Sequence, residues 1–253
     1  MRIDILTLFP DMFAGVMNTS MMWKAQAHGF LSLHVHDLRT WTTDRHRTAD
    51  DTPYGGGGGM VMRADLVIAA VEAVQSQAAF APVYGMSPQG KLFSHAWALD
   101  LSKAERLILV CGHYEGIDDR ARQIAFTDEL SIGDYVLTNG ELAAMVIADA
   151  VVRQIPGVLG AAGGAERESL VDGVLEGAHY TRPLDVRGLR IPEVLQAGDH
   201  AAIARWRRED GLRRTWRSRP DLLRRATLSE ADKYLLATFA QEDARAIASR
   251  RDA

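Results

Sequence analysis

Leu107-Ile-Leu-Val-Cys111-Gly-His-Tyr-Glu-Gly116 reads as a strand that ends in a glycine-bounded turn. An unbroken apolar run of this length indicates a strand inside a sheet. Two other expected strands end in similar turns, Ser87-Pro-Gln-Gly90 and Ser131-Ile-Gly-Asp-Tyr-Val-Leu137. In open α/β sheets, ligands bind outside the carboxyl ends of the strands. Three such turns together predict a small-molecule pocket, although each alone would also suit a routine strand-to-helix turn.

Strands alternate with helices on both sides of this stretch. Strands are expected at 2–8, 31–38, 82–86, 107–111 and 126–130, and helices at 10–27, 64–77, 92–104, 117–125 and 140–153. This alternation indicates an α/β fold, a mostly parallel sheet with helices on both faces. A small-residue run, Gly-Ala-Ala-Gly-Gly-Ala at 160–165, predicts a mobile linker, and helices are expected again at 199–217 and 229–250. We therefore predict that the chain has three parts: an α/β domain (1–160), a linker (161–178) and a basic helical domain (179–253).

A second distinctive stretch is Asp44-Arg-His-Arg-Thr-Ala-Asp-Asp-Thr-Pro-Tyr54, followed by five glycines. Its cationic and titratable side chains, and glycine backbone that can approach a ligand closely, suit phosphate binding. No Lys-Ser or Lys-Thr pair follows the glycines, so this is not a Walker A loop. Met60 stands where a dinucleotide fingerprint starting at Gly55 needs its third glycine. A flexible, solvated hinge is the alternative.

Composition narrows the class of protein. The chain has 253 residues, of which 47% are hydrophobic and 25% charged, as is usual for a soluble globular protein. A single cysteine, Cys111, rules out an intrachain disulfide and a multi-cysteine zinc site. The amino terminus lacks a signal-peptide pattern and no apolar run approaches membrane-spanning length, so a cytoplasmic protein without a membrane partner is expected. The histidines lack ligand spacing to a carboxylate or cysteine, and no metal site is predicted from them.

Charge is unevenly distributed along the chain. The net charge is −4, yet from Ala178 to the end 16 Lys and Arg face 11 Asp and Glu. Nine arginines lie between Arg205 and Arg225, interleaved with Trp206 and Trp216. Guanidinium groups pair with phosphates and aromatic rings stack on bases, which favours nucleic-acid binding. The alternative is a solvated helix face.

Taken together, these stretches resemble the bacterial tRNA (guanine-N(1)-)-methyltransferases of the SPOUT class. The match runs from Thr7-Leu-Phe-Pro10 to Trp206-Arg207 and includes 44–48, 53–57, 87–90, 109–112, 114–118, 131–137, 155–160 and 179–183. The resemblance implies an α/β domain with a deep trefoil knot, followed by a small all-helical domain, in a homodimer with active sites at the subunit interface. It implies S-adenosylmethionine-dependent methylation of nitrogen 1 of the guanosine immediately 3′ of the anticodon (position 37) in tRNA.

The resemblance also assigns roles to individual residues. Those implied to bind the cofactor are Met86, Ser87, Pro88, Gly112, Tyr114, Glu115, Ser131, Ile132, Gly133, Tyr135, Val136, Leu137 and Gly140. Those expected to bind tRNA are Arg45, His46, Arg47, Arg182, Arg205, Arg207, Arg208 and Arg214. A dependence on Mg²⁺ is implied too, without identified ligands.

Catalysis requires a base and a cation. Nitrogen 1 of guanosine carries a proton at neutral pH, and negative charge develops on the exocyclic oxygen. Arg153 matches the family arginine that stabilises this oxygen, although a helix carboxyl terminus alone would also favour an arginine there. Glu168 stands where the family has its aspartate base, with Glu166 as the less favoured candidate. Glutamate is longer by one methylene, and a displacement of about 1 Å can cost on the order of 10²-fold in rate.

Smaller departures leave two alternative functions open. Asn139 and Ala143 replace a glycine and a proline of the family pattern, and Glu176 replaces an aspartate expected near the partner's pocket. Asparagine tolerates left-handed backbone, and alanine enters a helix without strain. The alternatives are a SPOUT methyltransferase for another RNA acceptor and a non-catalytic RNA-binding SPOUT protein.

Overall fold

The computed structural model describes residues 1–160 and 169–251, with no account of the side chains of 250 and 251. The chain forms two units, Met1–Ala162 and Gly163–Ala253. Residues 161–168 of the predicted linker lie outside the described residues, and the three-part division stays a prediction. No helix among the described residues is both long and apolar enough to cross a membrane.

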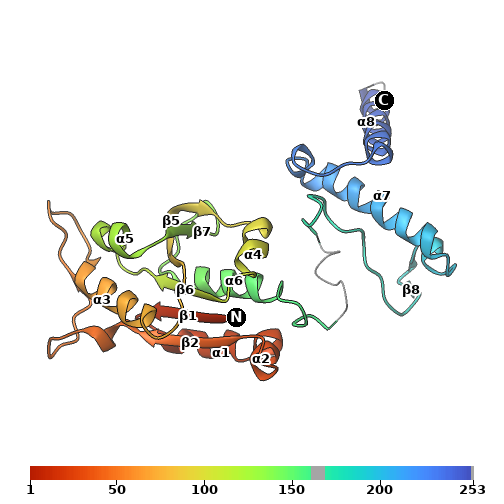
Figure 1. The fold of residues 1–253 in the computed structure, drawn as a ribbon. Helices are drawn as coiled ribbons and strands as arrows, with labels where there is room; N and C mark the ends of the chain where they lie inside the picture. Colours follow the sequence, from red (N-terminus) through yellow and green to blue (C-terminus); the bar gives the residue numbers. More distant parts are fainter. Residues whose placement is uncertain (161–168, 252–253) are drawn as a thin grey trace. The chain divides into compact units, whose positions relative to one another are not determined.

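A five-stranded sheet forms the centre of the first unit (Figure 1). Its strands are β1 (Arg2–Thr7), β2 (Ser32–Asp37), β5 (Val83–Leu92), β6 (Arg106–Cys111) and β7 (Asp128–Ser131). Their order is β2-β1-β6-β5-β7, and every neighbouring pair is parallel. The α/β class with a parallel sheet is therefore confirmed. All carboxyl ends of the strands meet along one edge, because the strands run in the same direction.

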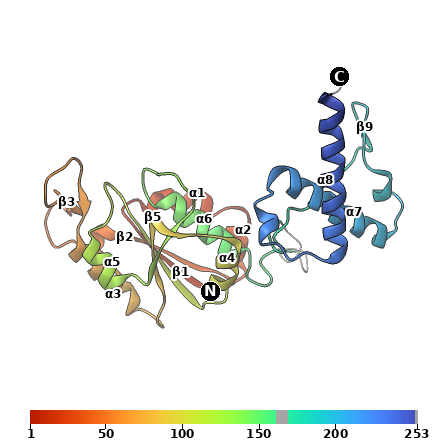
Figure 2. The ribbon, with the colours of Figure 1, turned by 90° about the horizontal axis from the view of Figure 1, so that it is seen from above.

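Helices cover both faces of this sheet (Figure 2). One face carries α1 (Phe13–Met17), α2 (Ser20–Ala27), α4 (His95–Leu101) and α6 (Glu141–Val152), and the other carries α3 (Ala64–Gln75) and α5 (Asp119–Ala125). Every residue of β6 is buried, with Leu107 and Leu109 facing the first set of helices and Ile108 and Val110 the second. Burial on both faces favours apolar side chains, which explains the hydrophobic run from Leu107 to Cys111.

The single helix expected at 10–27 is wrong. The structure has a short 3₁₀ helix η1 (Pro10–Met12), then α1, a break at Asn18 and Thr19, and then α2. Thr19 adopts an extended backbone, and its hydroxyl donates to the Gly15 carbonyl at 2.9 Å. Asn and Thr compete with helical hydrogen bonds through such local side-chain bonds.

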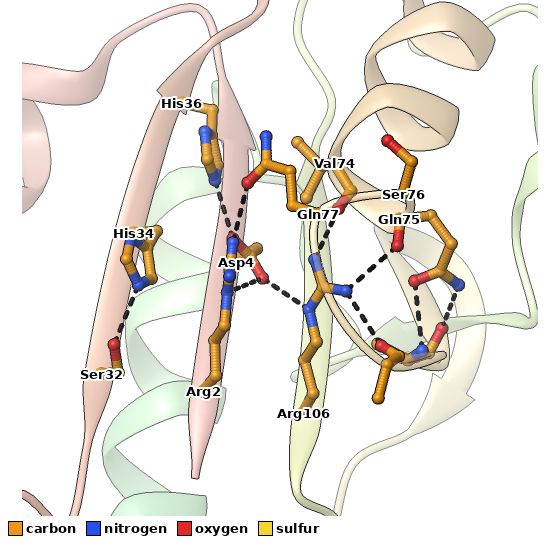
Figure 3. A network of polar contacts seen from close by, with 12 residues as sticks. Arg2, Asp4, Ser32, His34, His36, Val74, Gln75, Ser76, Gln77 and Arg106 are labelled. Carbon is orange, nitrogen blue, oxygen red and sulfur yellow. Dashed lines mark hydrogen bonds and ion pairs between the residues drawn. The ribbon is translucent and has the colours of Figure 1, made fainter.

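A buried polar network joins the two edges of β1 to its neighbours (Figure 3). The Asp4 carboxylate, fully buried, accepts hydrogen bonds from Arg2, Arg106 and His36 at 2.7–2.9 Å. Burial alone would raise the pKa of Asp4, but these donors hold it well below its usual range. Arg106 also donates to carbonyls at the end of α3, including that of Val74 at 2.6 Å. The network thus ties β2, β1, β6 and α3 together.

The second unit is helical, as predicted. It contains α7 (His200–Ser218), α8 (Glu230–Arg251) and 3₁₀ turns η4 (Glu193–Leu195) and η5 (Leu222–Arg224). Its core is centred on Val174, Leu212 and Phe239. A hairpin of two strands with two residues each, β8 (Asp185–Val186) and β9 (Leu189–Arg190), was not predicted, because strands this short carry no periodic signal. The trefoil knot is not tested by the strand order and stays a prediction.

Candidate functional site

The three turns singled out in the sequence meet where β6 and β7 end and where β5 bulges, and they enclose a cavity of about 220 Å³. All thirteen residues implied to bind the cofactor line it: Met86, Ser87, Pro88, Gly112, Tyr114, Glu115, Ser131, Ile132, Gly133, Tyr135, Val136, Leu137 and Gly140. The sequence reasoning did not assign other lining residues, among them Gln89, His113, Ile117, Arg122, Glu129 and Leu130. That these residues bind a cofactor stays a prediction.

Close backbone contact between the second and third turns shapes the cavity. The amide of Gly140 donates to the carbonyl of Gly112 at 2.8 Å. A Cβ at Gly140 would lie 2.9 Å from the Cα of Cys111, the amide nitrogen of Gly112 and the Cβ of Met86. Only glycine allows this approach, since two of the three neighbours are backbone atoms.

The first turn lies inside a strand rather than after one. β5 continues to Leu92, and its pairing with β7 shifts register between Met86 and Lys91, so that residues 87–90 bulge from the sheet. A Cβ at Gly90 would lie 2.5 Å from the backbone of Glu129 and Leu130. The expected strand at 82–86 was therefore too short. Bulging lets Ser87 and Pro88 reach the cavity while the strand remains paired beyond them.

The third turn presents apolar side chains to solvent at the cavity. Tyr135 is 55% exposed and Val136 84% exposed. The Ser131 hydroxyl donates to the Gly133 carbonyl at 3.1 Å, which folds the turn locally. Large apolar groups exposed beside a concave pocket are typical of a ligand or partner surface.

The glycine-rich stretch packs against the second turn. The amide of Glu115 donates to the Met60 carbonyl and the amide of Met62 to the Gly116 carbonyl, both at 2.9 Å. A short hairpin, β3 (Asp50–Asp51) with β4 (Val61–Met62), closes the stretch at its base. Gly59 has φ +81°, and a Cβ there would lie 2.3 Å from a carboxylate oxygen of Glu115. The structure therefore joins this stretch to the cavity instead of leaving it as an isolated hinge.

The Asp44 carboxylate organises the basic part of that stretch. It accepts hydrogen bonds from the amides of His46 and Thr48 and from the Thr48 hydroxyl, at 2.9–3.2 Å. Arg47 reaches Asp37 at 3.4 Å. Arg45 and His46 are exposed, and neither side chain has an ion-pair partner in residues 1–160 and 169–251. Both remain available to an anionic ligand.

One side chain that lines the cavity, Tyr114, has a shifted pKa. Burial first, and the nearby Asp50 second, raise the pKa of the Tyr114 hydroxyl, which stays neutral at physiological pH. Arg122 forms ion pairs with Glu129 and with Asp119 on the cavity wall. Within the described chain, no three His, Cys, Asp or Glu side chains come together as a metal site would require. The Mg²⁺ dependence stays a prediction.

Of the two residues assigned to catalysis, the structure describes Arg153 but not Glu168. Arg153 caps the carboxyl end of α6, where its amide donates to the Asp149 carbonyl at 3.1 Å. Its side chain is partly exposed and makes further interactions. Glu168 and Glu166 lie outside the described residues. The amino end of α6 therefore lies at the cavity, and Arg153 lies at its carboxyl end. The identity of the base stays a prediction.

The arginines of the second unit fall into two groups. Arg208 pairs bidentately with Asp232 at 2.9–3.0 Å, and Arg214 pairs with Asp210 at 2.6 Å. Arg182, Arg205 and Arg207 are exposed and, within the described part of the chain, form no ion pair. Arg208 and Arg214 already have carboxylate partners, so the exposed Arg182, Arg205 and Arg207 are the better supported for binding an anion.

Comparison with known proteins identifies the family. Residues 1–225 match the family model described as tRNA (Guanine-1)-methyltransferase TrmD. A tRNA (guanine-N(1)-)-methyltransferase of Geobacter sulfurreducens is 51% identical over 242 residues, covering 96% of this chain and 99% of the relative. A Chloroflexus aggregans protein of the same name is 54% identical over 244 residues, covering 94% and 95%. A third, from Moorella thermoacetica, is 51% identical over 245 residues, covering 96% and 98%. The chain therefore belongs to the tRNA (guanine-1)-methyltransferase family of enzymes.

Proposed function

We propose that the chain transfers the methyl group of S-adenosylmethionine to nitrogen 1 of the guanosine immediately 3′ of the anticodon (position 37) in tRNA. The observation that carries the proposal is the meeting of the three turns in one cavity, beside a loop whose Arg45 and His46 side chains are exposed and have no ion-pair partner within residues 1–160 and 169–251. A donor pocket next to a phosphate-binding surface is what methylation of RNA needs.

The cavity fits an adenosine-containing donor. The contact between Gly140 and Gly112 brings the second and third turns together, and in this proposal backbone groups of the third turn, from Ile132 to Leu137, bind the adenine edge. Apolar side chains such as Leu137 supply a surface for the ring. When bound, the donor supplies an electrophilic methyl group.

Removal of the proton on guanine nitrogen 1 falls to Glu168 in this proposal, with Glu166 as the second candidate. The guanidinium of Arg153 stabilises negative charge on the exocyclic oxygen, a role suited to a permanently charged donor group. Glutamate in place of the family aspartate is longer by one methylene and keeps a carboxylate that can accept the proton.

A second copy of the chain completes the site in this proposal. The helices η1, α1, α2 and α6, in which α1 contacts the other three, carry exposed apolar side chains: Met12, Val16, Trp23, Leu142 and Val146. Met12 also accepts a hydrogen bond from Asn139 on the cavity lining, at 3.7 Å to its sulfur. The apolar patch is thus continuous with the cavity, and an apolar patch of this kind favours a protein partner.

The RNA contacts are proposed for the exposed cations of both units. Arg45 and His46, next to the cavity loops, suit anticodon-stem phosphates, and Arg47 extends the same surface. Arg182, Arg205 and Arg207 add charge from the second unit. The target base must leave its stack to reach the methyl group, as in other enzymes that modify bases.

The decisive experiment measures transfer of labelled methyl from S-adenosylmethionine to an unmodified tRNA transcript with guanosine 3′ of its anticodon. The control transcript has adenosine at that position. Methylation of the first transcript alone is expected. Transfer to neither, with intact donor binding, would favour a non-catalytic protein or another RNA acceptor.

Glu168→Gln tests the base separately. We expect turnover to fall by at least about 10²-fold, because the amide cannot accept the proton, while donor affinity is unchanged. Glu166→Gln is the matched control, with turnover close to wild type. Wild-type turnover of Glu168→Gln would end this assignment.

A further inference from the structure

The first residue of α6 buries a carboxylate next to the cavity wall. Glu141 is 0% exposed, and one of its oxygens accepts a hydrogen bond from the Thr7 hydroxyl at 2.5 Å. The other oxygen, Oε2, is buried and has no hydrogen-bond partner in the residues that the structure describes. No ion pair within 1–160 and 169–251 includes Glu141.

A buried carboxylate without a cation is costly, because the charge loses its hydration. The Thr7 hydroxyl offsets part of this cost. The amino terminus of α6 offsets another part, but a helix terminus carries only about half a positive charge. A positive charge from outside the chain, placed near this carboxylate, would offset more of the cost.

The cavity is where such a charge would arrive. Gly140 precedes Glu141 and Ala143 follows it by two residues, and both line the cavity. Burial first, and the charge of Glu141 second, raise the pKa of the Cys111 thiol. Cys111 ends β6, and its Cα would lie 2.9 Å from a Cβ on Gly140. Glu141 therefore follows directly on a residue that contacts the strand end on which the cavity is built.

Other charges at the cavity do not cancel this field. Arg122, a cation on the wall, is paired with Glu129 and Asp119. Glu115 lines the cavity and adds negative charge. Burial raises the pKa of Tyr114, which also lines the cavity, so its hydroxyl adds no charge. The surroundings of the cavity are therefore net negative.

We propose that Glu141 is a specificity residue whose buried charge favours the sulfonium cation of S-adenosylmethionine over the neutral thioether of S-adenosylhomocysteine. This inference rests on the proposed function, which supplies the donor. Methyl transfer breaks the bond between sulfur and the methyl carbon and leaves its electron pair on sulfur, so the product loses the positive charge. The product then lacks the attraction to Glu141, which favours its release.

The test compares two ligands that differ in this charge. Glu141→Gln keeps the size of the side chain and an oxygen to accept from Thr7, but removes the charge. Calorimetric titration should show S-adenosylmethionine binding to the variant about tenfold more weakly than to wild type, which is about 1.4 kcal/mol. Binding of S-adenosylhomocysteine should change less than about twofold, since a neutral sulfur has no charge for Glu141 to attract. Equal losses for the two ligands, or no loss for the cation, would overturn the proposal.

Two variants control for other effects. Glu72→Gln removes the same charge from the exposed face of α3 and should leave both affinities unchanged. Thr7→Val removes the hydrogen bond but keeps the charge, so any loss should be equal for the two ligands. If Glu141→Gln does not fold, Glu141→Leu removes both the charge and the unpartnered polar atom, and the same difference between ligands is expected.

The outcomes separate this proposal from the proposed function. Wild-type protein that binds neither ligand would refute the donor assignment itself. Wild-type protein that binds both, with a variant that weakens both equally, would refute only the role of Glu141.

Discussion

Replacing Gly140 with alanine tests whether contact between the turns is necessary for the cavity. The added Cβ would lie 2.9 Å from the backbone of Cys111 and Gly112 and from the Cβ of Met86. Neither backbone atom is at the end of a flexible side chain, so β6 and the third turn must separate. Separation also lengthens the 2.8 Å hydrogen bond between Gly140 and Gly112.

The magnitude follows from three contributions. Overpacking by one methyl group in a close-packed site costs about 1–3 kcal/mol. Weakening the hydrogen bond adds about 1 kcal/mol. The backbone of Gly140, at φ −83° and ψ −10°, is open to alanine, which recovers about 0.4–1 kcal/mol by restricting the unfolded chain. We expect the free energy of unfolding to fall by about 2 kcal/mol.

Urea unfolding followed by circular dichroism measures this change, and calorimetric titration measures S-adenosylmethionine affinity. Affinity should fall at least about tenfold, because Gly140 and Gly112 both line the cavity. Gly15→Ala is the control, since a Cβ there has no neighbour within 4 Å and alanine is the better helix former. Wild-type stability and affinity in Gly140→Ala would refute the reasoning.

Three further predictions concern the second unit. Arg208→Ala should lower the free energy of unfolding by about 2 kcal/mol at neutral pH, because it removes the bidentate pair with Asp232. Arg208 lowers the pKa of Asp232 to about 2, so the stability that the ion pair contributes is present above about pH 4 and is lost as the pH falls towards 2. Thermal unfolding should therefore show a stability difference between Arg208→Ala and wild type that shrinks over that range. A difference independent of pH would contradict this prediction. Arg205→Ala and Arg207→Ala should each weaken tRNA binding, measured by filter binding, and reduce the slope of log affinity against log salt concentration by about 1. Arg214→Ala should weaken tRNA binding less, because Arg214 is paired with Asp210. Equal effects of the three substitutions would contradict the division into paired and exposed arginines.

Local sequence patterns predicted most of the helices and strands of the first unit. Burial on both faces favours apolar residues, so 107–111 was predicted as a strand, and only the charged Arg106 at the start of β6 was missed. The helix at 10–27 was wrong because Thr19 bonds to the Gly15 carbonyl and breaks it. The length of β5 was missed because Gly90 resembles a turn residue, yet its role is to admit the backbone of Glu129.

The sequence by itself determined the α/β class, the three turns and their glycines, and the family resemblance, because these depend on local chain preferences and on ordered motifs. Only the tertiary structure decided which groups are buried, paired or exposed. Thr7 and Glu141 lie 134 residues apart, and nothing in either segment predicts their hydrogen bond. The arginines likewise look alike in sequence, yet Arg208 is held by Asp232 while Arg205 is exposed. Burial and pairing arise from contacts between distant segments, and their energies depend on the solvent that those contacts exclude.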